Sequence, residues 1–95
     1  MIEVRIRPER IKISGHAGYA EPGKDIVCAA VTALTQTLIQ SIENLTDDEI
    51  EYRISPGKAE IEYRNLSEKS KTLVDSFFVG IRLIADEFPD YVAIM

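Results

Sequence analysis

The chain of 95 residues contains one cysteine, one histidine and no tryptophan. A single cysteine cannot form a disulfide within the chain, which favours a reducing compartment, so we expect a cytoplasmic protein. The histidine and the cysteine, even with the nearby Asp25, are too few for the four ligands of a structural zinc site. No Cys-x-x-Cys redox motif and no Walker-type phosphate loop is present either. The sequence therefore predicts neither a metal nor a cofactor.

Positive charge is also scarce, since 11 Lys and Arg face 16 Asp and Glu, for a net charge of −5. Proteins that bind nucleic acid through its phosphates rely on clustered Lys and Arg, so we expect no direct contact with nucleic acid. No segment approaches the roughly 20 apolar residues of a membrane span. The N-terminus, MIEVRIRPER, lacks the apolar centre of a signal peptide, and we expect no membrane contact.

Four short segments alternate apolar with polar or charged residues, the pattern of strands with one buried face. Pro8-Glu9 joins the first two segments and SPGK, residues 55–58, joins the last two, so two hairpins are predicted. The apolar residues that alternate are Ile2, Val4, Ile6, Ile11, Ile13, Ile50, Tyr52, Ile54, Ala59, Ile61 and Tyr63.

Two helices are predicted, one after each hairpin. Asp25 is a suitable N-cap for a helix that runs to about Asn44, and Ser67 for a second helix that Pro89 ends. The segment DYVAIM can add a short terminal strand. Because the strands are apolar on one face only, both helices should cover the same side of the sheet. The expected fold is a single α+β domain, residues 1–95: a two-layer sandwich with the order strand-strand-helix-strand-strand-helix and a mostly antiparallel sheet.

The only histidine and the only cysteine flank a loop of small residues, in the stretch GHAGYAEPGKDIVCAA. If Asp25 caps the helix, Cys28 lies in its first turn, where free backbone N–H groups and the helix dipole favour an anion. His16 leaves the second strand, and the chain between them is long enough for the imidazole to reach the thiol. A thiolate beside a general base is the arrangement of a cysteine nucleophile. Backbone N–H groups at the helix start, including that of Cys28, are candidates for holding an oxyanion.

Several alternatives remain open at this point. A lone cysteine in an apolar helix is usually a small buried hydrophobic residue. Asp25 has two possible roles, as a helix cap or as a third member that orients His16. Strict strand alternation also places His16 on the face opposite the core. An approach to Cys28 therefore requires the chain to deviate at Gly15, where glycine permits an unusual turn.

The stretch GHAGYAEPGKDIVCAAVTAL resembles the signature of the ribosomal-processing cysteine proteases, the Prp family. That signature is Gly-His, about ten residues with a glycine near the end, then Asp-x-Val-Cys-Ala-Ala-x-Ser. The chain matches it at Gly15, His16, Gly23, Asp25, Val27, Cys28, Ala29 and Ala30. Thr32 stands where members usually have serine, and it retains a hydroxyl group.

The resemblance implies a cytoplasmic, homodimeric endopeptidase with Cys28 as nucleophile and His16 as general base. The implied substrate is the N-terminal extension of large-subunit ribosomal protein twenty-seven. It further implies a mobile substrate loop, in which we single out Ala17, Gly18, Tyr19 and Gly23.

Two other functions are compatible with the sequence. One is a non-catalytic ribosome-associated domain that binds RNA or protein through the polar sheet face, with Arg5, Lys12, Arg53 and Arg64. The other is a housekeeping dimer whose cysteine is structural. Rapid alkylation of Cys28 by iodoacetamide near neutral pH would distinguish the protease from both.

Overall fold

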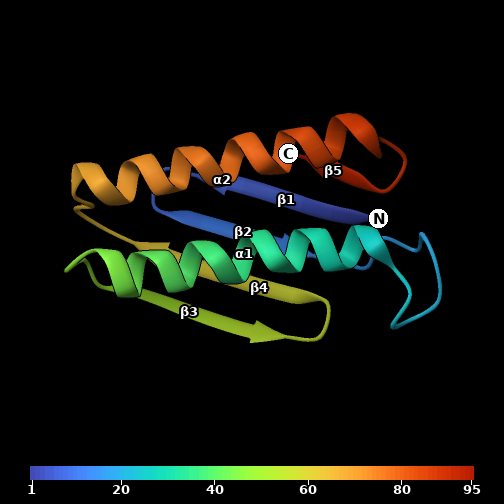
Figure 1. The fold of residues 1–95 in the computed structure, drawn as a ribbon, viewed down its shortest axis with the longest axis horizontal. Helices are drawn as coiled ribbons and strands as arrows, with labels where there is room; N and C mark the ends of the chain where they lie inside the picture. Colours follow the sequence, from blue (N-terminus) through green and yellow to red (C-terminus); the bar gives the residue numbers. More distant parts are fainter.

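The computed structural model describes residues 1–95 and has two helices and five strands (Figure 1). Their order confirms the predicted α+β fold, and the short terminal strand is present. The elements are β1 (Ile2–Arg7), β2 (Arg10–Ser14), α1 (Ile26–Leu45), β3 (Ile50–Ser55), β4 (Lys58–Tyr63), α2 (Glu68–Glu87) and β5 (Val92–Ile94).

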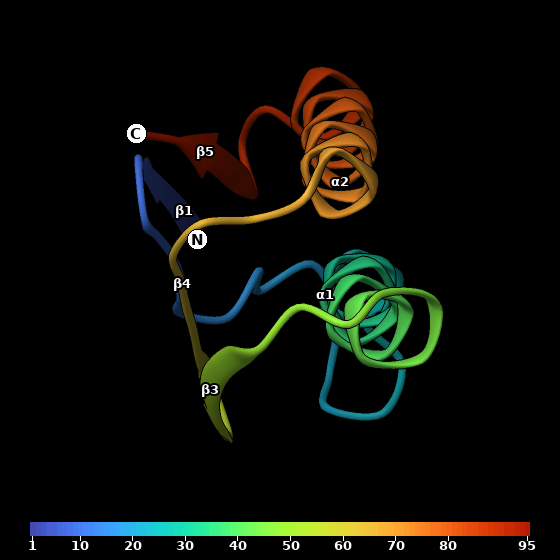
Figure 2. The same ribbon diagram turned by 90° about the vertical axis from the view of Figure 1, so that its left-hand side faces the viewer.

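The five strands form one sheet in the order β3-β4-β2-β1-β5. Both hairpins are antiparallel, and β2 joins them by pairing antiparallel with β4. The last strand, β5, runs parallel to β1, so the two ends of the chain meet at one edge of the sheet. Both helices lie on the same side of the sheet, and its other side is open (Figure 2).

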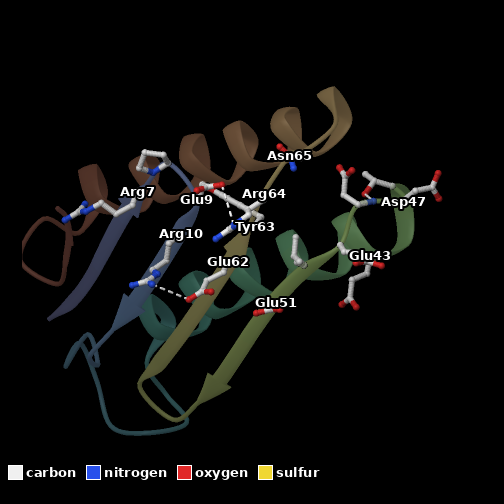
Figure 3. A pocket seen from close by; sticks show the side chains of 15 residues that line it. Arg7, Glu9, Arg10, Glu43, Asp47, Glu51, Glu62, Tyr63, Arg64 and Asn65 are labelled. Atoms are coloured by element: carbon white, nitrogen blue, oxygen red, sulfur yellow. Dashed lines mark hydrogen bonds and ion pairs between the residues drawn. The ribbon is translucent and has the colours of Figure 1, made fainter.

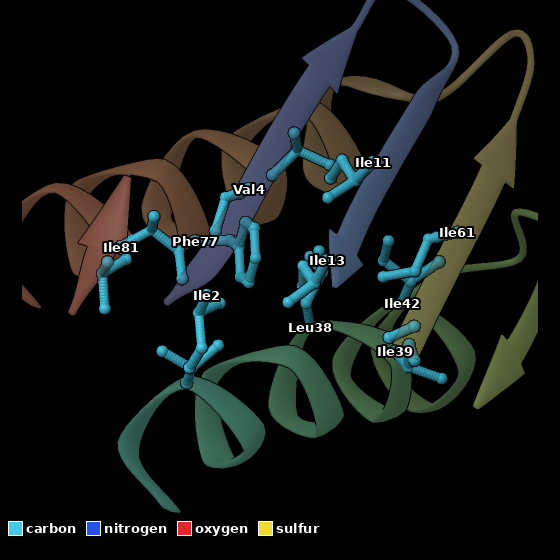
Figure 4. Packing of buried hydrophobic residues seen from close by; sticks show 14 of the residues in the cluster. Ile2, Val4, Ile11, Ile13, Leu38, Ile39, Ile42, Ile61, Phe77 and Ile81 are labelled. Atoms are coloured by element: carbon cyan, nitrogen blue, oxygen red, sulfur yellow. The ribbon is translucent and has the colours of Figure 1, made fainter. Parts of the chain in front are cut away.

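The core lies between the helices and the sheet and contains 17 buried apolar residues (Figure 4). The inward positions of β1, β2 and β4 meet one stripe of each helix, as the alternation predicts. Both predicted N-caps are confirmed: the Asp25 carboxylate accepts hydrogen bonds from Val27 and Cys28, and the Ser67 hydroxyl accepts one from Ser70.

The prediction of a half-buried third strand is wrong for most of β3. Tyr52 and Ile54 point to the helix side yet remain 42% and 44% exposed. β3 is the edge strand beyond β4, and two helices do not extend over a sheet of five strands. The alternation of residues therefore predicted correctly which side of β3 is apolar. That side stays exposed because the helices do not reach over it.

Helix α1 corrects a second expectation, because it is long and apolar enough to cross a membrane by length and composition. In the fold, Val27, Val31, Leu38, Ile39 and Ile42 are buried in the core. A helix that packs in a protein core needs apolar residues on its buried face. The core packing of α1 therefore explains its high hydropathy without a membrane.

Asp48 links the end of α1 to the start of α2. Its Oδ2 atom accepts hydrogen bonds from the backbone N–H of Ser67 at 2.9 Å, from the Ser67 hydroxyl at 2.6 Å and from the buried Ser70 hydroxyl. The hydroxyl of Ser67, then that of Ser70 and the Ser67 N–H, hold the pKa of Asp48 below its ordinary value of 3.8. The carboxylate thus fixes the separation of the two helices at this end.

Candidate active site

Gly15 turns the chain out of β2, the deviation that the approach of His16 requires. Its φ is +94°, and a Cβ atom here would overlap the backbone carbonyl oxygen of Met1. The Gly15 N–H donates to the Gly57 carbonyl at 2.9 Å, which ties the turn to the β3–β4 hairpin. Only glycine meets both demands, a positive φ and contact with the backbone of the first residue.

The imidazole of His16 lies over Gly57, at the tip of that hairpin. A Cβ atom built on Gly57 would lie 2.7 Å from Nε2 and 3.1 Å from Cε1 of the ring. The ring is exposed and its side chain makes no hydrogen bond within the chain. The absence of a side chain at position 57 therefore provides the space that the imidazole occupies.

Cys28 is the third residue of α1 and is half-buried. The backbone N–H of Ala17, a buried residue next to His16, donates to its Sγ atom at 3.3 Å. The structure thus brings the start of the loop, which carries the histidine, directly to the thiol.

Asp25 uses both carboxylate oxygens on backbone N–H groups. Oδ1 accepts from Val27 and Cys28 at 3.0 and 2.9 Å, and Oδ2 accepts from Tyr19 and Ala20 at 3.0 and 3.4 Å. The Cys28 N–H foremost, then those of Ala20, Tyr19 and Val27, hold its pKa below the ordinary value of 3.8, while burial opposes them. Asp25 is therefore a cap that also holds the loop, and it makes no hydrogen bond to His16.

This capping corrects the expectation for the oxyanion. The N–H of Cys28 already donates to Asp25 and is not free at the helix start. The donor that lies at the sulfur is instead the N–H of Ala17, from the loop. No sequence pattern marks this contact, because it depends on how the chain turns after Gly15.

His16 and Cys28 line one cavity of about 220 Å³ between the start of α1 and the β3–β4 hairpin. Thr32 of α1, the position that departs from the family signature, also lines it. The other lining residues are Ile2, Ile13, Gly15, Val31, Thr35, Gln36, Ile54, Ser55, Gly57, Lys58 and Ala59. The side chains of His16 and Cys28 therefore border the same space.

The remaining loop residues singled out in the sequence lie beside this cavity but do not line it. Gly18 and Gly23 have φ of +72° and +86°, with open space around each Cα. Tyr19 packs its ring against Phe88 and Tyr91 of the α2–β5 connection.

A larger cavity, of about 1360 Å³, lies at the opposite end of the sheet, around the β1–β2 turn and the end of α1 (Figure 3). Its lining is mostly charged, and it contains neither the histidine nor the cysteine. Arg10 and Arg64 there pair with Glu62 and Glu9 (Figure 3). No group of three or more His, Cys, Asp or Glu side chains in the chain is arranged to hold a metal ion.

Comparisons with known proteins point to one family. The family model described as cysteine protease Prp matches residues 1–93. A ribosomal processing cysteine protease Prp from Mycoplasma genitalium is 27% identical over 96 residues, which cover 99% of this chain and 94% of the relative.

Solved structures agree with this fold. The crystal structure of SMU.848 from Streptococcus mutans is 30% identical, with a TM-score of 0.79, and covers 98% of this chain and 89% of that one. An essential ribosomal processing protease Prp from S. aureus, in complex with a covalently linked product peptide, superimposes with a TM-score of 0.89. It is 19% identical over 98% of this chain and 94% of that one.

Proposed function

The chain belongs to the Prp family of cysteine proteases, and on this premise we propose that Cys28 is the nucleophile and His16 the general base. One observation supports the assignment above the others. The two side chains line the same cavity, and the backbone N–H next to His16 donates to the Cys28 sulfur. They are also the only thiol and the only imidazole in the chain.

In the proposed mechanism, His16 takes the proton of the Cys28 thiol and the thiolate attacks the carbonyl carbon of the scissile peptide bond. The resulting oxyanion accepts a hydrogen bond from the Ala17 N–H, the donor that lies at the sulfur. Protonated His16 gives its proton to the leaving amine as the C–N bond breaks, which leaves a thioester on Cys28. Water, deprotonated by His16, then hydrolyses the thioester and restores the thiol.

We propose that the substrate is the N-terminal extension of large-subunit ribosomal protein twenty-seven. The motif resemblance supports this substrate, and the name of the M. genitalium relative assigns ribosomal processing to that protein. The Prp structure from S. aureus was also solved in complex with a substrate peptide. From the same resemblance we propose that the enzyme acts in the cytoplasm and is a homodimer.

The test is mass spectrometry of the purified protein mixed with the ribosomal protein from the same source, its extension intact. A single cut that removes the extension is expected, and Cys28→Ala should abolish it without changing the fold. His16→Ala should slow it strongly, since general base catalysis contributes roughly 10²–10⁴-fold. Cleavage by Cys28→Ala at the normal rate would rule out the mechanism, and an uncut extension in the presence of reactive Cys28 would rule out the substrate.

The structure does not favour the alternative of an RNA-binding sheet face. Of its four cations, three lie 3.5 to 3.9 Å from a carboxylate, namely Arg5, Lys12 and Arg64, and Arg53 alone makes no ion pair. Paired cations of this kind offer little net charge to phosphate groups. Membership of an enzyme family also separates the chain from non-catalytic binding domains and from a dimer with a merely structural cysteine.

A further inference from the structure

The loop between His16 and Cys28 is attached to a distant part of the chain through one aromatic side chain. The Tyr19 ring contacts Phe88 at a centroid distance of 5.5 Å and Tyr91 at 5.2 Å. The interplanar angles are 81° and 77°, so both contacts are edge-to-face, the favoured geometry for aromatic pairs. We call these three residues the aromatic cluster.

The two partners of Tyr19 belong to a well-ordered connection. Phe88 caps α2, and its N–H donates to the Ile84 carbonyl at 2.8 Å. The Tyr91 N–H donates to Phe88 at 3.0 Å, and the Tyr91 carbonyl accepts from Ile2 of β1 at 2.8 Å. The connection is thus bonded to both the helix layer and the sheet, which makes it a firm support for an exposed loop.

A short path leads from the aromatic cluster to the sulfur. Tyr19 is two residues from Ala17, whose N–H donates to Sγ of Cys28. The Tyr19 N–H donates to Asp25, which in turn accepts from the Cys28 N–H. The tyrosine ring therefore holds the loop from outside, while the aspartate holds the same backbone from the helix side.

We propose that Tyr19 is a positioning residue, which holds the Ala17 N–H at the Cys28 sulfur by packing against Phe88 and Tyr91. The proposal rests on Cys28 being the nucleophile. Without the ring, this part of the loop is attached only through its backbone N–H groups, which donate to the side chains of Asp25 and Cys28, and the Ala17 N–H spends less time at the sulfur. The Cys28 sulfur then loses its backbone hydrogen-bond donor.

The test measures alkylation of Cys28 by iodoacetamide as a function of pH, which follows the thiolate without any peptide substrate. In Tyr19→Ala we expect alkylation near neutral pH to slow roughly tenfold, the scale of one lost hydrogen bond to a charged group. Tyr19→Phe keeps the ring and should restore the wild-type profile. Tyr52→Ala is the matched control, because Tyr52 is equally exposed, at 42%, but lies on β3 outside the cluster.

Cleavage of the ribosomal protein provides the second measurement. Tyr19→Ala should lower kcat in step with the alkylation rate near neutral pH, whereas a ring that only bound substrate would raise KM alone. Tyr91→Ala should reproduce the slower alkylation from the other side of the cluster. Circular dichroism and thermal unfolding identify any variant that is not folded.

An unchanged alkylation profile in folded Tyr19→Ala would overturn the positioning role while wild-type cleavage left the proposed function intact. If Tyr19→Phe were as impaired as Tyr19→Ala, the hydroxyl and not the ring would be responsible, and the proposal would also fail. A wild-type Cys28 that neither cleaves nor alkylates faster than a free thiol would instead refute the proposed function itself.

Discussion

Replacing Gly57 by alanine should displace the His16 imidazole, the proposed general base, without changing it chemically. The new Cβ would lie 2.7 Å from Nε2 of His16, whereas an ordinary contact between heavy atoms is about 3.5 Å. The ring must therefore move by about 0.8 Å, or the hairpin tip must move by the same amount. Because a displacement of about 1 Å can cost on the order of 100-fold in rate, we expect kcat/KM to fall roughly 10- to 100-fold.

The same substitution also affects stability, and this effect must be separated from the first. Gly57 has a φ of +72°, where a residue with a Cβ is disfavoured by about 1–2 kcal/mol. Gly18 has the same φ of +72° and no atom within 4 Å of a built Cβ. Gly18→Ala therefore measures the backbone cost alone, and the two variants should lose similar free energy of unfolding.

The assay exploits the single histidine of the chain. Proton–carbon NMR of the imidazole gives one set of ring signals, which we expect to shift in Gly57→Ala and to change far less in Gly18→Ala. Cleavage of the ribosomal protein is measured on the same samples. If Gly57→Ala leaves both the ring signals and cleavage unchanged, Gly57 does not place the ring. Shifted signals with full cleavage would refute His16 as the general base.

Two further predictions concern stability. Gly15→Ala should lower the free energy of unfolding by more than about 2 kcal/mol, because the overlap with Met1 adds to the strained φ. Gly23→Ala is the control, since Gly23 has a similar φ of +86° and open surroundings. A denaturant titration in which Gly15→Ala loses no more free energy than Gly23→Ala would contradict this prediction. The lowered pKa of Asp48 means that the unfolded chain binds its proton first, so the stability it contributes is complete above pH 3.8 and is lost as the pH falls through the lower folded value. The thermal unfolding temperature should therefore fall more steeply at acidic pH for the wild type than for Asp48→Asn, and parallel curves would show that Asp48 adds nothing.

Most of the fold could be predicted because its signals are local. Alternation identified β1, β2 and β4, and the capping residues Asp25 and Ser67 begin the helices where expected. Coverage by other elements is not local, and for this reason the exposed apolar face of β3 could not be foreseen. The membrane-like composition of α1 is a similar case, since only the packing shows that its apolar stripe faces a sheet.

In the candidate site, too, the features with a local signal could be predicted and those that depend on distant contacts could not. His16 and Cys28 stand out as the only residues of their kind, and the turn at Gly15 follows from strand geometry. Gly57 could be predicted only as a turn glycine, since its contact with the imidazole depends on the pairing of β2 with β4. The Ala17 N–H was missed because backbone donors carry no mark in the sequence. Asp25 had two possible roles that only its four hydrogen bonds could separate.

The pairing of β5 with β1 also fixes when during protein synthesis this fold can be completed. β1 leaves the ribosome before the other described strands, whereas its parallel partner β5 is translated after all of them. Phe88 and Tyr91, which support the loop, emerge only shortly before β5. A nascent chain therefore carries its histidine and thiol long before the loop between them has its support, and we expect the newly made enzyme to remain inactive until Phe88, Tyr91 and β5 have left the ribosome.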